Sequence, residues 1–194
     1  MADDAVDYAA LSLAEVRSGL EAIAGEVHAT FGGLGSGQLN WRSDPGRWSV
    51  AQCFEHLLTA DRLMFRAAEE ALADGAARSV WQRLPIVPSL LGRMLIRSQA
   101  PGGTRRFTAP AQAQPASSDI DANIVQRFVE QQRGAVARLR TLDERRAARV
   151  VMTSPFIKVV TYSVLDGWRL VLAHERRHFE QARGVARSPG FPTA

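Results

Sequence analysis

Apolar residues recur at every third or fourth position along four long stretches of the chain, which is the period of an amphipathic α-helix. The first stretch begins at Ser12, which makes a capping-box pattern with Glu15, and ends at Gly32 and Gly33. The spacing predicts a first helix between these signals, with one apolar stripe made of Leu13, Val16, Leu20, Ile23 and Val27.

A second helix is predicted after a connector that contains two tryptophans, Trp41 and Trp48. Ser49 and Gln52 repeat the capping-box pattern at its start, and Gly75 is a natural stop. This helix is strongly apolar on one side, where it carries Val50, Phe54, Leu57, Leu58, Met64, Phe65 and Leu72.

Two further helices are predicted in the second half of the chain. The third runs from near Ser118 to about Leu142, and the fourth starts at Ser163, with Asp166 at the capping position, and stops at Gly184. No convincing alternation of apolar and polar residues indicates a strand. The apolar positions of these two helices include Ile120, Ile124, Phe128, Val136, Leu139, Leu165, Trp168, Val171, Leu172 and Phe179.

The connector of residues 75–118 is far longer than a tight turn, although residues 90–97 within it predict a short helix. A connector of this length can return the chain across a bundle, so the second and third helices can run parallel. We therefore expect an all-α fold, a four-helix bundle with a long crossover between helices two and three. One domain spans residues 1–194, with its core at about 12–184 and a short tail at 185–194.

The composition excludes several classes of protein. The 194 residues are 46% hydrophobic and 23% charged, which suits a globular domain rather than a disordered chain. No uncharged apolar run approaches the roughly 18 residues of a membrane span. The acidic start, with Asp3 and Asp4, differs from a signal peptide, and the single Cys53 cannot form an internal disulfide. These features predict a cytoplasmic protein.

The formal net charge of +4 conceals an asymmetry along the chain. Residues 1–74 hold 12 acids against 5 arginines, whereas residues 75–194 hold 19 basic groups against 8 acids. The long connector contains no acid and six arginines, which can form a positive rim that attracts carboxylate or phosphate; the alternative is a solvated surface. Arg93 and Arg97 are the candidate substrate-binding residues, beside Arg78, Arg83, Arg105 and Arg106.

Two histidines four residues apart, His174 and His178, lie on the predicted fourth helix in the run HERRH. This spacing places both rings on one face, within reach of one metal ion. The run also fits the HExxH pattern of zinc proteases, with Glu175 as the general base. That interpretation is disfavoured because Gln181 stands where the extended protease pattern has glycine, and no later histidine follows.

The better third ligand is His56, which lies on the second helix in an apolar context where an unpartnered imidazole is costly. Two facing helices would then give a three-histidine site with an open coordination position. The alternative is that His56 is a hydrogen-bonded core residue. Cys53, one turn before His56, can project near the metal or be a small buried residue, and His28 fits the edge of the first helix better than a ligand position.

Two segments carry a family resemblance: LNWRSDPGRWSVAQCFEHLL, and later YSVLDGWRLVLAHERRHFEQARGV. Their order and spacing resemble the DinB-like superfamily over roughly residues 12–184. The resemblance implies a four-helix bundle with one metal ligand from the second helix and two from an HxxxH near the C-terminus, often followed by glutamine. The matching positions are His56, His174 and His178, with Gln181 at the glutamine. Three imidazoles suit zinc or nickel and do not choose between them.

The resemblance also implies an activity. The superfamily includes thiol-dependent transferases and isomerases that use low-molecular-weight thiols such as bacillithiol or mycothiol. A metal with an open position lowers the pKa of a bound thiol or water. We therefore expect a metal-dependent transferase or hydrolase acting on a small molecule, with Trp48, Cys53 and Gln181 near the metal or in the pocket. No general base is evident.

Two other classes of function stay open at this point. A non-catalytic bundle could serve only for dimerisation, and a homodimer is compatible with such a fold. The basic second half could bind nucleic acid, but the sequence has no helix-turn-helix, no zinc finger and no interleaving of aromatic and basic residues. The polarised charge therefore favours an anionic small molecule over nucleic acid.

Overall fold

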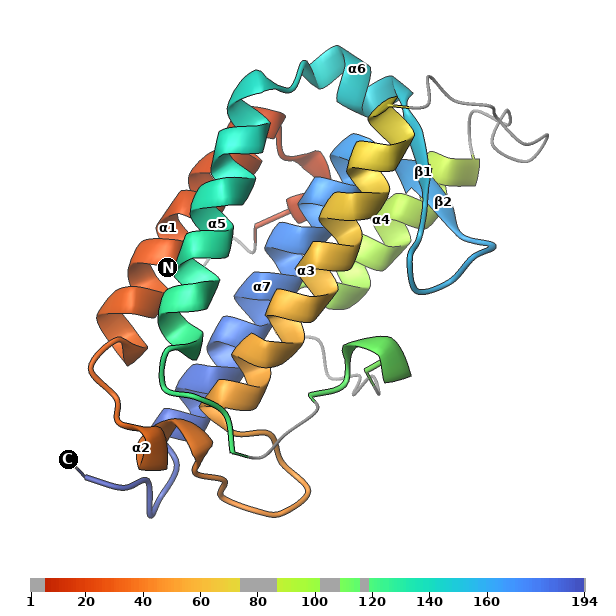
Figure 1. Cartoon of the computed structure of the whole chain (residues 1–194). Coiled ribbons are helices and arrows are strands. Elements are labelled where there is room, and N and C mark those ends of the chain that lie inside the picture. The colour runs from red at the N-terminus through yellow and green to blue at the C-terminus, as the bar shows by residue number, and fades with distance from the viewer. Residues whose placement is uncertain (1–5, 74–86, 102–108, 116–118, 194) are drawn as a thin grey trace, which may run out of the picture.

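The computed structural model describes residues 6–73, 87–101, 109–115 and 119–193, and it is mostly helical (Figure 1). Four long helices lie side by side: α1 (Leu13–Phe31), α3 (Val50–Ala73), α5 (Ile124–Thr141) and α7 (Val164–Ala186). Figure 1 shows α3 and α5 running in one direction and α1 and α7 in the other. The expected all-α bundle, with parallel second and third long helices, is confirmed.

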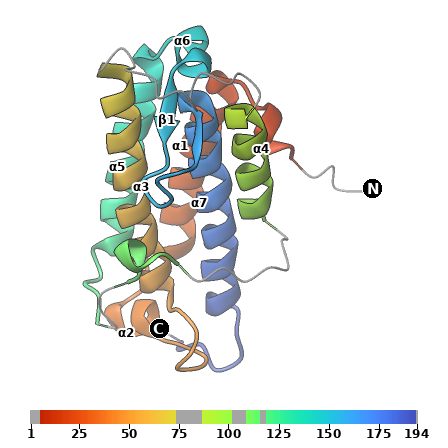
Figure 2. The same cartoon turned by 90° about the vertical axis from the view of Figure 1, so that its right-hand side faces the viewer.

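Shorter elements cover the ends and one side of the bundle. The helix α4 (Val87–Gln99) is longer than the predicted 90–97 helix and lies along α7 (Figure 2). The remaining elements are η1 (Tyr8–Ala10), α2 (Ser36–Asn40), η3 (Ala111–Ala113), α6 (Glu144–Arg149), β1 (Val151–Thr153) and β2 (Thr161–Ser163).

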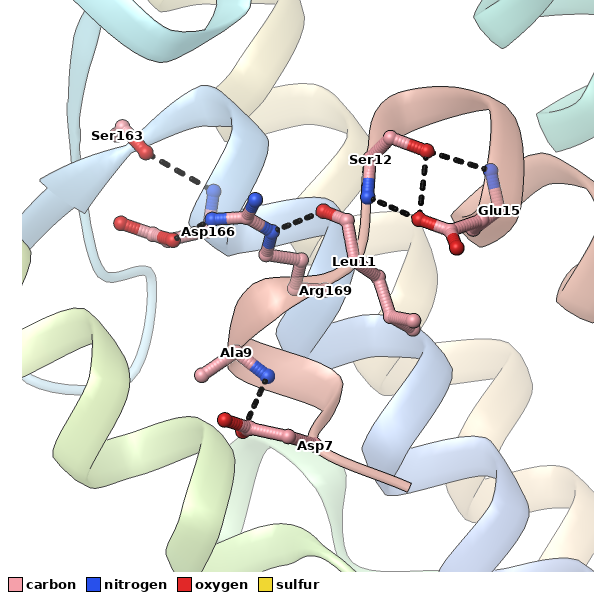
Figure 3. Close-up of polar contacts among 8 residues, drawn as sticks. All are labelled: Asp7, Ala9, Leu11, Ser12, Glu15, Ser163, Asp166 and Arg169. Atoms are coloured by element: carbon pink, nitrogen blue, oxygen red, sulfur yellow. Dashed lines mark hydrogen bonds and ion pairs between the residues drawn. The ribbon is translucent and has the colours of Figure 1, made fainter.

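The helix starts follow the capping signals of the sequence. At α1, the Ser12 hydroxyl accepts from the Glu15 backbone N–H, and the Glu15 carboxylate accepts from the Ser12 N–H (Figure 3). Ser49 and Gln52 exchange the same pair of bonds at α3. Each box satisfies backbone donors that the first turn of a helix leaves without partners. Both helices therefore begin at positions fixed by local sequence.

The start of α7 is also tied to the N-terminal segment. The Ser163 hydroxyl accepts from the Asp166 N–H at 3.0 Å. Asp166 in turn pairs with Arg169, whose Nε donates to the Leu11 carbonyl at 2.7 Å (Figure 3). This arginine links the chain that enters α1 to the first turns of α7. The two helices are thereby held in register at one end of the bundle.

The third long helix begins later than predicted. A start near Ser118 falls at residues outside those described, and α5 begins only at Ile124. The intervening residues form other contacts: the backbone of Ile120 bonds to the Asn40 side chain through both its N–H and its C=O. Asp121 then accepts from the Asn123 N–H. Apolar residues at helical spacing continue before Ile124, but the backbone groups named here bond to side chains instead of to a helical turn.

A short β-hairpin was missed by the sequence pattern. Val151–Thr153 pairs antiparallel with Thr161–Ser163, with Met152 opposite Tyr162. Each strand has three residues, and alternation becomes recognisable only over about four to eight. The expectation of no strand is therefore wrong. The hairpin leads directly into α7 and packs against α4.

The C-terminal tail is shorter than predicted and packs against the bundle. The helix α7 continues past Gly184 to Ala186. Beyond it, the Phe191 ring meets Trp41 edge-on with 5.5 Å between ring centroids. The Gln38 amide donates to the Pro192 carbonyl at 2.9 Å. Trp41, one of the tryptophans before the second predicted helix, is used here rather than at the histidines.

The hydrophobic core runs along the inside of the four long helices. Phe54 of α3 lies between Phe31 of α1 and Phe128 of α5, with ring centroids 5.4 and 5.1 Å apart.

The buried faces of these helices belong to this core, and no helix within the described ranges is both long enough and apolar enough to cross a membrane. Other side chains fully buried in this core include Leu20, Ile23, Leu39, Leu57, Ile124, Met152, Tyr162 and Phe179.

Candidate metal centre

Three histidines from two antiparallel helices converge at one point. His56 comes from α3, and His174 and His178 come from successive turns of α7. Their ligand nitrogens all lie within 4.8 Å of one another, and the Nε2 atoms of His56 and His174 are 3.1 Å apart. The structure thus brings together the three residues that the sequence proposed as ligands. The third ligand lies more than a hundred residues away along the chain, on the neighbouring helix.

Other contacts orient the His56 ring. Its Nδ1 bonds to the Ala113 carbonyl of η3, which leaves Nε2 directed at His174. A carbonyl that fixes one nitrogen of a histidine sets which nitrogen is available to a metal. Trp48 packs on the same ring at a centroid distance of 4.9 Å and stacks on His178 at 5.7 Å. The tryptophan before the helix cap therefore forms part of the wall of the site.

His178 offers a buried nitrogen without a partner. Its Nδ1 is buried and has no hydrogen-bond partner. Gln181, three residues further along α7, lines the pocket with His178 and offsets a small part of the effect of burial on the pKa of that ring. A buried imidazole nitrogen without a partner is costly unless another atom, such as a metal ion, takes its lone pair. This observation fits a ligand role and places Gln181 beside the centre.

The protonation state of the three rings also suits metal binding. Burial lowers the pKa of His56, and the Ala113 carbonyl offsets only part of that effect. Burial lowers the pKa of His178 to about 3. For His174, burial and then the neighbouring His178, His56 and Arg177 hold the pKa well below its ordinary value. Neutral imidazoles are the form that binds a metal.

The geometry fits a divalent ion with a free position. Two nitrogens bound tetrahedrally at 2.0–2.1 Å from zinc would be about 3.3 Å apart, close to the 3.1 Å between His56 and His174. Three protein ligands with a fourth position open are typical of catalytic rather than structural zinc sites. The nitrogen donors suit nickel as well as zinc.

The histidines line a pocket of about 780 Å³, a size that suits a small organic molecule. Its polar side chains include Arg47, Asp61, Arg177 and Gln181. The Arg177 guanidinium also donates to the Ser98 carbonyl at 3.0 Å. Between the polar groups the walls are apolar, formed by Met64, Leu95, Phe156, Ile157, Leu170 and Val171.

The other proposed site residues lie elsewhere. Cys53 is fully buried in the core and does not line the pocket, and burial raises the pKa of its thiol to about 12. His28 is exposed on α1. Arg93 and Arg97 are exposed on α4 and are not among the pocket residues; Arg97 pairs with Asp7 at 3.8 Å. Four connector arginines, Arg78, Arg83, Arg105 and Arg106, fall outside the described residues.

Glu175, the glutamate of HExxH, points into the core. Its side chain is fully buried and not among the pocket residues, and it contacts Asp61 of α3. A protease base has to reach the water at the metal. The structure therefore gives no support to the protease interpretation.

Asp61 and Glu175 form a buried acid pair that the sequence reasoning missed. Burial raises the pKa of Asp61 to about 8, and Glu175, Gln131 and Gln132 offset only part of that effect. Burial and the nearby Asp61 hold the pKa of Glu175 well above its ordinary value. A signal was present, since Asp61 follows Leu57 by four residues and so occupies the apolar stripe of its helix.

Replacing Asp61 by asparagine should flatten the dependence of stability on pH. The pKa of this carboxyl is about 4 in the unfolded chain and about 8 in the native fold, so the native fold binds the proton more tightly. Its contribution to the free energy of unfolding is fully present below pH 4. That contribution is lost as the pH rises toward 8. Urea unfolding of metal-free protein should show the wild type losing more free energy of unfolding between pH 5 and 8 than Asp61→Asn. Parallel profiles would contradict the raised pKa, and Asp44→Asn, an exposed change of the same kind, should follow the wild type.

The fold and the site geometry together define a class of protein: a helical bundle whose histidines can hold one metal ion beside an open pocket. A family model of the DinB superfamily matches residues 19–182, so the chain belongs to this superfamily. The matched range includes all three histidines. Searches of curated proteins and of solved structures found no match.

Proposed function

We propose that this protein is a metal-dependent transferase of the thiol-dependent type, in which His56, His174 and His178 hold a divalent zinc or nickel ion. The observation that carries the proposal is the position of the three convergent ligand nitrogens at a pocket of about 780 Å³. A purely structural metal site would have four protein ligands. Among the residues that the structure describes, three supply ligand nitrogens, and all three line the pocket.

The ion would supply Lewis-acid chemistry, because it lowers the pKa of a thiol or water at its open position. The protein's own residues bind and orient the reactants. Trp48 fixes the rings of His56 and His178, and the Ala113 carbonyl fixes the orientation of His56. The apolar walls exclude water from a thiol's carbon chain. Arg177 and Arg47 give the pocket a positive side that favours an anionic group on the substrate.

In the transfer, the sulfur of a low-molecular-weight thiol forms a bond to an electrophilic carbon of the second substrate. The leaving group departs with the electron pair of the broken bond, and the thiol proton passes to solvent. Hydrolysis is the same displacement with water in place of the thiol. The two activities therefore use the same residues and differ in which nucleophile the pocket accepts.

The proposal is tested by reconstituting the protein with Zn²⁺ or Ni²⁺ and measuring conjugation of thiols to 1-chloro-2,4-dinitrobenzene. The thiols to compare are bacillithiol, mycothiol, glutathione and cysteine. We expect at least one thiol to react faster with metal-loaded protein than with metal-free protein. A nitrophenyl ester assayed without thiol separates hydrolysis from transfer.

Protein that holds one metal per chain but accelerates none of these reactions would contradict a transferase or hydrolase and leave a non-catalytic bundle. A salt titration of DNA binding supplies the remaining comparison, because affinity for nucleic acid falls steeply with salt. Steep salt dependence with no metal bound would favour nucleic-acid binding instead.

A further inference from the structure

One wall of the pocket carries a buried carboxyl whose hydrogen-bonding capacity the protein does not use. Asp61 is 1% exposed and lines the pocket from α3. Its Oδ2 accepts from Gln131 Nε2 at 3.4 Å, a long bond, and its Oδ1 has no hydrogen-bond partner. A carboxyl accepts hydrogen bonds through its carbonyl oxygen even when it is protonated, so the oxygen without a partner can take a further donor.

The neighbouring Glu175 and Gln132 offset part of the effect of burial on the pKa of Asp61, but neither bonds to its Oδ1. Glu175 is also buried, and apart from its contact with Asp61 neither of its carboxyl oxygens has a hydrogen-bond partner. Gln132 is fully buried beside the pair, and neither polar atom of its side chain is hydrogen-bonded. Buried polar groups in native proteins are nearly always paired, so a cluster of unpaired atoms calls for an explanation. A donor brought in by a ligand of the pocket would provide one.

The position of Asp61 relates it to the histidine centre. Asp61 follows His56 by five residues on the same helix, a rise of about 7.5 Å along the axis. Ala60 of α3 and Val171 of α7 line the pocket in the same region. Arg177 and Gln181 come after His174 on α7, in the opposite direction along the groove between the antiparallel helices. The pocket therefore holds an acid as well as a cation beside the three histidines.

We propose that Asp61 determines which ligand this pocket selects. Its carboxyl accepts a hydrogen bond from an O–H or N–H group of a molecule whose other end lies at the three-histidine centre. This inference rests on the proposed function and narrows its substrate class to thiols that carry a hydroxyl or amino group several bonds from the sulfur. A plain alkanethiol of the same size leaves the carboxyl unmatched.

The test uses protein loaded with Co²⁺, whose visible absorption reports binding at the metal without any turnover. The probes are mercaptoalkanols of two to six carbons, each compared with the alkanethiol of equal non-hydrogen atom count. One chain length should reach from the three-histidine centre to the Asp61 carboxyl. At that length we expect the wild type to bind the mercaptoalkanol about tenfold more tightly than the matching alkanethiol. Asp61→Leu, which keeps the branching at Cγ but is larger and has no acceptor, should abolish this preference.

Asp61→Asn keeps a carbonyl acceptor at the same place and should retain an intermediate preference. A purely structural role would shift the affinity of both probe series equally and leave their ratio unchanged. Asp44→Leu, the same exchange on an exposed loop, should keep the wild-type ratio. If Asp61→Leu fails to fold, the intermediate ratio of Asp61→Asn decides the question.

The wild-type ratio in both Asp61 variants, or no hydroxyl preference at any chain length, would overturn the inference while leaving the proposed function intact. The absence of any spectral change with either probe series, in protein that holds one Co²⁺ per chain, would overturn the proposed thiol chemistry and this inference together. The two failures are therefore distinguishable.

Discussion

Replacing His178 by alanine is expected to abolish stoichiometric metal binding while the bundle stays folded. The variant removes one of three ligand nitrogens, and the remaining pair, His56 and His174, offers too few donors to hold a divalent ion tightly. We expect the affinity for Zn²⁺ to fall by at least about a hundredfold, a loss of roughly 2.7 kcal/mol or more. The measurement is competition for Zn²⁺ against a chromophoric chelator, with circular dichroism as the check on folding.

His28→Ala provides the matched control. His28 also lies on a long helix, but its side chain is exposed and does not belong to the ligand group. It should bind metal as the wild type does. Unchanged affinity in His178→Ala, with one metal per chain, would refute the ligand assignment. Equal losses in the two variants would point to an unspecific effect of removing an imidazole.

Replacing Leu57 by alanine is expected to cost about 2–5 kcal/mol of unfolding free energy. Leu57 is fully buried, next to His56 on α3, and belongs to the core between the long helices. The loss combines the transfer free energy of the removed methyl and methylene groups with the cavity they leave. Since small domains are stable by only about 5–15 kcal/mol, this is a large fraction of the total. Urea unfolding of metal-free protein is the measurement.

The same exchange at Leu90 should change the unfolding free energy by less than about 0.5 kcal/mol. Leu90 is 66% exposed on α4, so its side chain leaves little packed surface behind. Because the chemical change is identical, the difference between the two variants measures burial alone. Similar losses at both positions would contradict the placement of Leu57 in the core.

The four long helices were predictable because their information is local. A capping serine, an apolar stripe and a stop signal lie within a few turns of one another, as at Ser12 and Ser49. The elements missed or misplaced are those whose backbone hydrogen bonds do not follow a single local period. Ile120 is bound by Asn40, eighty residues earlier, and the strand residue Thr153 pairs with Thr161 across a loop.

The residues of the candidate site also divide into those predictable from one helix and those that depend on the packing of two. The sequence places His174 and His178 on one helix face, because residues four apart always lie together. Adding His56 depended on its apolar context and on a family resemblance, since no local rule relates α3 to α7. Asp61 was visible in sequence only as a charge within an apolar stripe. That it pairs with Glu175 beside the pocket follows from the packing of two helices.

The sequence by itself determined the helices, their buried faces and the pair of histidines on α7, because each depends on the fixed geometry of a single helix. Only the tertiary structure decided that His56 meets this pair, that Trp48 packs on the rings, and that Cys53 faces the core. The physical reason is that the contact between two helices depends on the fit of whole apolar faces. Which polar residues meet at their edge is a consequence of that fit and is encoded at no single position.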